Sequence, residues 1–104
     1  MNILFNTANN INGSEKMNTR LTALIAEKLN RFSEYITRIE AHLSDSNGQK
    51  EGQNDKQCVL EARLQGLQPI AVTSNANTYD EAVTGAISKL KSSLDTTLGK
   101  LKSH

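Results

Sequence analysis

The chain has 104 residues, with twelve lysines and arginines against eleven acids and a net charge of +1. This length predicts a single domain over residues 1–104 that can bury a core without metals, and the lone cysteine, Cys58, excludes an internal disulfide. No apolar run approaches the roughly 20 residues that span a bilayer, and the N-terminus lacks a signal-peptide pattern, so we expect a cytoplasmic protein with no membrane partner.

The first part of the chain predicts a strand, a helix and a second strand. Residues 2–8 form a short strand candidate. A helix is expected from about Ser14, a suitable N-cap, to the segment 32–35. Residues 36–43 alternate between apolar and polar side chains, which indicates a half-buried strand. The apolar positions of the helix, at helical spacing, are Met17, Leu21, Leu24, Ile25, Leu29 and Phe32.

The middle of the chain predicts a loop followed by a hairpin. Residues 44–56 are polar, contain two glycines, and are expected to form a mobile loop. Residues 57–65 alternate most regularly and predict the strongest strand, whose core-facing side chains are Cys58, Leu60, Ala62 and Leu64. A turn over residues 66–69 then leads into a strand over residues 70–75.

The longest periodic signal is a helix over residues 78–102. Thr78 and Glu81 have the spacing of a capping box at its start. An amphipathic helix of this length requires a partner surface, because isolated helices are marginal in water. Its apolar stripe consists of Val83, Ile87, Leu90, Leu94, Leu98 and Leu101.

The order of elements is therefore β-α-β-β-β-α. One stripe of each helix and one face of each strand are apolar, while the other strand face is polar. This pattern predicts an α+β fold of two layers, with a four-stranded, antiparallel-type sheet carrying two helices on one face.

The chain shows no recognisable catalytic constellation. The two histidines, His42 and His104, are far apart in sequence, and Cys58 belongs to the inward set of its strand. The adjacent acids Asp80 and Glu81 are explained by the helix start. No metal-ligand spacing or phosphate-binding glycine loop is present, so we expect no enzyme, no cofactor, no metal and no small-molecule substrate.

Basic side chains recur in register on both helices. Pairs separated by eleven residues, about three helical turns, share one flank of a helix. Such pairs on two adjacent helices could follow a phosphate backbone, whereas the alternative is an ordinary solvated face rich in lysine and arginine. The pairs are Arg20 and Arg31, Lys89 and Lys100, and Lys91 and Lys102, and Lys28 lies beside the first pair.

A second interpretation places function on the polar face of the sheet. In that case the chain would be a protein-interaction module of the same fold that does not bind RNA. Its contact surface would consist of Arg38, Glu40, His42, Glu61 and Arg63.

The chain resembles the short ribosome hibernation promoting factors, the ribosome-associated inhibitor family also known as sigma-54 modulation proteins. The resemblance covers most of residues 20–102 and rests on order and spacing, since no single motif is diagnostic. The segments that carry it are IAEKLNRF (25–32), ITRIEAHLSD (36–45), DKQCVLEAR (55–63), QPIAVT (68–73) and YDEAVTGAISKL (79–90).

The resemblance implies a fold akin to double-stranded-RNA-binding domains. It also implies binding to rRNA in the small-subunit channel for mRNA and tRNA, which silences translation during stress or stationary phase. The residues that match the family's basic positions are Lys28, Arg31, Lys89, Lys91, Lys100 and Lys102, and Arg20 supports them from the helical pattern.

The chain departs from typical members in being less basic and in carrying the long loop 44–56. It ends at His104, so we expect the extra dimerisation domain of the family's long forms to be absent and the protein to be a monomer.

Overall fold

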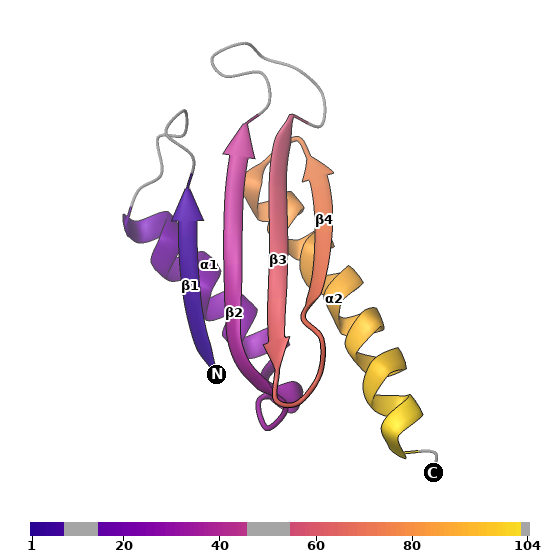
Figure 1. Cartoon of the computed structure of the whole chain (residues 1–104). Helices are drawn as coiled ribbons and strands as arrows, with labels where there is room; N and C mark the ends of the chain where they lie inside the picture. The colour runs from indigo at the N-terminus through magenta and orange to yellow at the C-terminus, as the bar shows by residue number, and fades with distance from the viewer. Residues whose placement is uncertain (8–14, 46–54, 103–104) are drawn as a thin grey trace.

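A computed structural model of the chain describes residues 1–7, 15–45 and 55–102 (Figure 1). Its element order is β-α-β-β-β-α, as the periodicities predict, with one short 3-10 turn, η1, after the first helix. The elements are β1 (Asn2–Thr7), α1 (Glu15–Lys28), η1 (Asn30–Phe32), β2 (Ile36–Asp45), β3 (Lys56–Leu64), β4 (Ile70–Ala76) and α2 (Tyr79–Lys102).

The four strands form one sheet in the order β1-β2-β3-β4, and both helices lie against the same face of it (Figure 1). This confirms the two-layer α+β fold. The expectation of an antiparallel-type sheet is wrong for β1, which pairs parallel to β2, whereas β2, β3 and β4 pair antiparallel. The sheet is mixed because α1 crosses between β1 and β2 and returns the chain to the end from which β1 started.

Two predicted boundaries differ from the structure. The first helix does not run as one α-helix to residues 32–35, because it ends at Lys28 and the chain tightens into η1, where the amide of Phe32 donates to the carbonyl of Leu29. The predicted loop is shorter than residues 44–56, because its ends continue the ladder of β2 and β3, with Asp45 opposite Lys56.

Two further predictions concern residues outside the described part of the chain. They are the N-cap at Ser14 and the mobility of the loop within residues 46–54.

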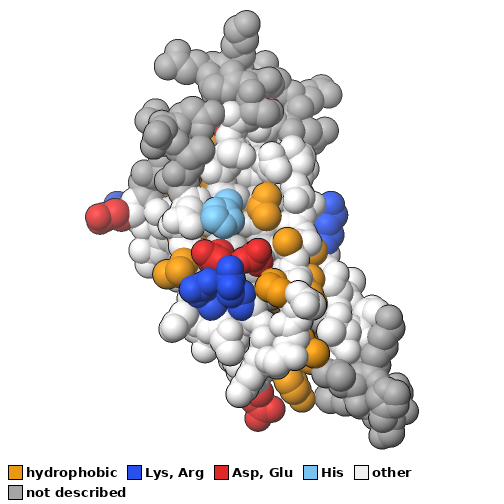
Figure 2. All heavy atoms as spheres, in the orientation of Figure 1, with side chains coloured by type: hydrophobic (Ala, Val, Ile, Leu, Met, Phe, Trp, Pro, Cys, Tyr) orange, Lys and Arg blue, Asp and Glu red, His pale blue; other side chains and the backbone are white. Residues whose placement is uncertain are grey.

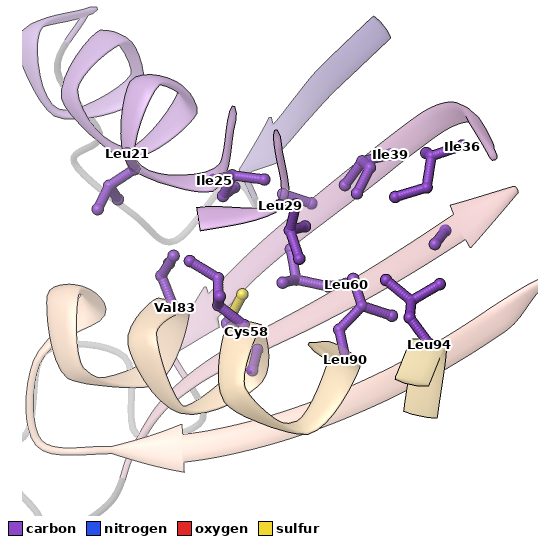
Figure 3. Close-up of a cluster of buried hydrophobic side chains, with 14 of the residues drawn as sticks. Leu21, Ile25, Leu29, Ile36, Ile39, Cys58, Leu60, Val83, Leu90 and Leu94 are labelled. Atoms are coloured by element: carbon purple, nitrogen blue, oxygen red, sulfur yellow. The ribbon is translucent and has the colours of Figure 1, made fainter. Parts of the chain in front are cut away.

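One hydrophobic core lies between the helices and the sheet. Figure 3 shows side chains of α1, α2, β2 and β3 converging on this layer. The predicted core positions are confirmed, since every one of these residues is buried: Leu60, Ala62, Leu64, Ile87, Leu90 and Leu94. Met17 and Leu24 of the predicted α1 stripe are partly buried at its margin.

The start of α2 is fixed by its cap. The hydroxyl oxygen of Thr78 accepts a hydrogen bond from the amide of Glu81 at 3.1 Å, which is one half of the predicted capping box. One turn later Gly85 faces the buried Ser74 of β4, and a methyl group at Gly85 would overlap the Ser74 hydroxyl. The glycine therefore allows α2 to approach the sheet closely.

We expect Gly85→Ala to destabilise the protein by up to about 2 kcal/mol, because an overpacking cost of about 1–3 kcal/mol is partly offset by the roughly 1 kcal/mol that alanine contributes to a helix. In a Ser74→Ala background the same change should cost less, since the overlapping hydroxyl is absent. Chemical denaturation of the wild type, the two single variants and the double variant measures both effects. Equal costs in the two backgrounds would show that Ser74 does not limit the approach of α2.

Candidate nucleic-acid interface

A groove runs between α1 and α2 and contains most of the predicted cationic site. Three hollows of about 440, 240 and 240 Å³ follow one another along both helices, and their lining residues come from both sides. We call these hollows together the interhelical groove. Its ionic side chains are Arg20, Glu27, Lys28 and Arg31 from the α1–η1 side and Asp80, Lys91 and Asp95 from α2.

Both arginines of the predicted site are ion-paired across this groove. Nη1 of Arg20 donates to Oδ2 of Asp80 at 2.7 Å. Nη2 of Arg31 donates to both carboxylate oxygens of Asp95, at 3.0 and 2.8 Å. The guanidinium of Arg31 also lies 4.5 Å from the ring centroid of Phe32, which adds a cation–π contact. The two arginines therefore share the α2-facing flank that their spacing predicts, but their charges are already balanced.

Lys28 and Lys91 line the middle hollow of the groove from opposite helices. The same hollow is also lined by the apolar side chains of Leu24 and Ile87 and by the hydroxyl-bearing Thr84 and Ser88. Neither lysine forms a salt bridge with any other described residue. These two ammonium groups are therefore the cations of the groove that form no described salt bridge.

The other three predicted cations do not line the groove in the described part of the chain. The Nζ of Lys89 donates to the backbone carbonyl of Thr73 at 2.7 Å, on the edge strand β4. A lysine at this place covers a polar group of an open sheet edge. Lys100 and Lys102 belong to the last turn of α2, and the structure describes only their backbone. Four of the seven predicted residues, Arg20, Lys28, Arg31 and Lys91, are thus brought together.

The sequence interpretation missed the partners of the arginines. In the sequence pattern the helix start accounts for Asp80, and no pattern assigns a role to Asp95. Their spacing of fifteen residues, roughly four helical turns, places both aspartates near one face of α2 and could have indicated an acidic edge.

The interpretation also missed a buried ionic cluster where β2 and β3 meet the undescribed segment. Nζ of Lys56 donates to Asp45 at 2.8 Å and to the 2% exposed Asp55 at 3.3 Å, and it lies 5.7 Å from the Tyr79 ring centroid. The hydrogen bond to Asp45 is the main cause that raises the pKa of Lys56, so the ammonium form is favoured. Paired in this way, the carboxylates avoid the cost of isolated buried charge, which gives the cluster a structural role.

The face of the sheet opposite the helices carries the residues of the alternative interpretation. Figure 2 shows acidic and basic side chains gathered near its centre, beside the histidine. Glu40 contacts Arg38 at 3.5 Å and Arg63 at 3.6 Å, and Arg63 also contacts Glu61 at 3.4 Å. Because opposite charges balance within this patch, it does not favour a polyanion over a protein partner.

Cys58 is fully buried under the helices, and burial raises the pKa of its thiol to about 12. A thiol in this state is a poor nucleophile. Within the described ranges, no group of three or more histidine, cysteine, aspartate or glutamate side chains could hold a metal ion. None of the described helices is long and apolar enough to cross a membrane.

The pKa of Cys58 predicts a loss of stability at alkaline pH. The folded thiol ionises near 12 and the unfolded thiol near its ordinary value of 9.0, so the contribution of the neutral thiol is complete below 9.0 and falls as pH rises toward 12. The loss should be smaller in Cys58→Ala. Urea denaturation at pH 8 and pH 10.5 measures the free energy of unfolding of both proteins. An equal loss between the two pH values in wild type and Cys58→Ala would contradict this prediction.

Solved structures share this architecture. A ribosomal subunit interface protein from Coxiella burnetii superposes with a TM-score of 0.69 at 19% identity, covering 100% of both chains. The N-terminal domain of Protein Y from Thermus thermophilus superposes with a TM-score of 0.72 at 15% identity, covering 93% of this chain and 99% of that one. No curated protein matches the chain at a comparable level of significance. At these identities the structural likeness defines the fold class alone.

Within that fold class, the sequence itself assigns the family. A family model described as "Sigma 54 modulation protein / S30EA ribosomal protein" matches residues 6–102. The match covers nearly the whole chain, so the chain belongs to this family. The resemblance stated from the sequence segments is thereby confirmed.

Proposed function

We propose that the protein is a non-catalytic, ribosome-associated factor of the cytoplasm that binds small-subunit rRNA in the channel for mRNA and tRNA. Binding there would silence translation during stress or stationary phase. The observation that carries this proposal is the family match over residues 6–102. The two solved relatives in fold, one named as a ribosomal subunit interface protein, are consistent with it.

The interhelical groove supports RNA as the ligand. Lys28 and Lys91 place ammonium groups on both sides of one hollow, where a phosphate can be contacted from two helices. The chain contains only two phenylalanines and two tyrosines, and Phe32 is buried in the core. Without a row of rings for stacking bases, the groove is suited to recognising the backbone and shape of folded RNA.

The test is co-sedimentation of the purified protein with small ribosomal subunits at 50–200 mM salt. We expect binding as a monomer, with the logarithm of the affinity falling against the logarithm of the salt concentration by roughly 0.7–0.9 for each phosphate contact. Sucrose-gradient fractions of a stationary-phase lysate should contain the protein together with small subunits. Binding with little salt dependence would favour the alternative, a protein-interaction module that uses the charge-balanced sheet face.

A further inference from the structure

The interhelical groove carries its own carboxylates at the places where a phosphate would be bound. Its lining contains four cations and three carboxylates, which leaves one excess positive charge. Two of these carboxylates, Asp80 and Asp95, contact the two arginines directly. The third, Glu27, lines the same hollow as Arg20. A nearly neutral groove is a weak attractor of polyanions.

The geometry of the Arg31 pair is that of an occupied anion site. Both carboxylate oxygens of Asp95 are bound by the same guanidinium nitrogen, and the adjacent Phe32 ring holds the guanidinium from its face. A guanidinium recognises carboxylate and phosphate through the same set of N–H donors. Asp95 and an RNA phosphate would therefore compete for Arg31.

The two ion pairs contribute little to holding the fold together. The side chains of Arg20 and Asp80 are 60% and 51% exposed, and those of Arg31 and Asp95 are 59% and 54% exposed. Exposed pairs of this kind have small effects on stability, because water screens them and long side chains lose entropy in forming them. Their larger effect is on the charge that the groove presents to a ligand.

We propose that Asp80 and Asp95 are intramolecular competitors of phosphate, which hold Arg20 and Arg31 in the unbound protein and limit its affinity for rRNA. This inference rests on the proposed function. RNA binding takes each arginine from its aspartate, so part of the binding energy is used in breaking the pair, and affinity becomes sensitive to the state of these two carboxylates. The groove itself would then lower the affinity for rRNA, in addition to the low net charge of the chain.

The test uses Asp80→Asn, Asp95→Asn and the double variant in the full chain. Asparagine keeps the shape of aspartate and removes its charge. The probes are small ribosomal subunits and, separately, an RNA duplex without protein. For both probes we expect the double variant to bind roughly tenfold more tightly at low salt, because no ion pair has to be broken before the arginines contact phosphate. The salt slope should steepen by up to roughly 0.7–0.9 for each aspartate replaced, because the carboxylate that takes up a cation when its pair breaks in the wild type is then absent.

Two controls separate this mechanism from a general change in charge. Glu61→Gln removes one negative charge from the opposite sheet face and should leave affinity nearly unchanged. Arg31→Gln combined with Asp95→Asn should abolish the gain of Asp95→Asn, since the arginine that it releases is absent. Thermal melting of every variant reports whether the fold is intact.

The outcomes distinguish this inference from the proposed function. If wild type binds small subunits but Asp80→Asn and Asp95→Asn bind no more tightly than Glu61→Gln, the competition is refuted and the ribosomal function stands. If no variant binds small subunits, the proposed function fails. Affinity for the RNA duplex is then the measurement that tests whether the aspartates compete with phosphate. A gain for the duplex that persists without Arg31 would overturn the inference.

Discussion

Leu90→Ala should destabilise the protein by about 2–5 kcal/mol, because it removes a side chain that is fully buried in the middle of α2 and leaves a cavity in the core. Domains have a total stability of roughly 5–15 kcal/mol, so the loss is a large fraction of it. Urea denaturation measures the change as a lower midpoint at an unchanged slope.

Leu4→Ala is the matched control for this substitution. Leu4 has the same side chain but lies 46% exposed on β1, so its truncation should change stability by less than about 0.5 kcal/mol. If the loss at Leu90 were as small as the loss at Leu4, the apolar stripe of α2 would not form the core that the structure shows.

The sequence predicted the helices, the strands and their buried faces because those features depend on local signals. The stripe that contains Leu90 repeats at helical spacing, and the alternation in β2 and β3 has the period of a strand. The parallel pairing of β1 with β2 has no such signal in six residues. It follows from the crossover through α1, which brings β1 and β2 side by side in the same direction. Which edge of the sheet β1 occupies depends on how all four strands and both helices pack together.

The candidate site was predictable only in part. Helical spacing places Arg20 and Arg31 on one flank, but their partners Asp80 and Asp95 are 60 and 64 residues further along the chain. Which residue of α2 faces which residue of α1 depends on how both helices pack on the sheet. For the same reason, the contact of Lys89 with the carbonyl of Thr73 could not be predicted from the pattern of lysines on α2.

These contacts determine which substitutions best test the phosphate-binding proposal. Reversing Arg31 would place a second carboxylate beside Asp95, so a change in binding could reflect a changed groove. Lys28 and Lys91 line the groove from opposite helices and form no salt bridge with other described residues, so their substitution changes charge with less disturbance of neighbouring contacts.

The double reversal Lys28→Glu and Lys91→Glu should weaken binding to small ribosomal subunits roughly 100-fold or more at low salt, because it removes two charge-assisted contacts and adds repulsion from phosphate. The melting temperature should stay nearly unchanged, since neither side chain belongs to the core. Co-sedimentation across a salt series measures the affinity, and the lost contacts should also reduce the salt slope by roughly 1.4–1.8.

Glutamine variants provide the matched comparison, because Lys28→Gln with Lys91→Gln and Arg38→Gln with Arg63→Gln remove equal charge from opposite layers of the protein. If phosphates are bound in the interhelical groove, the lysine pair should lose much more affinity than the arginine pair. The opposite order, with the sheet-face arginines decisive and the groove lysines without effect, would refute the groove as the RNA site. The sheet face, whose charges are balanced by Glu40 and Glu61, would then be the surface through which the protein acts.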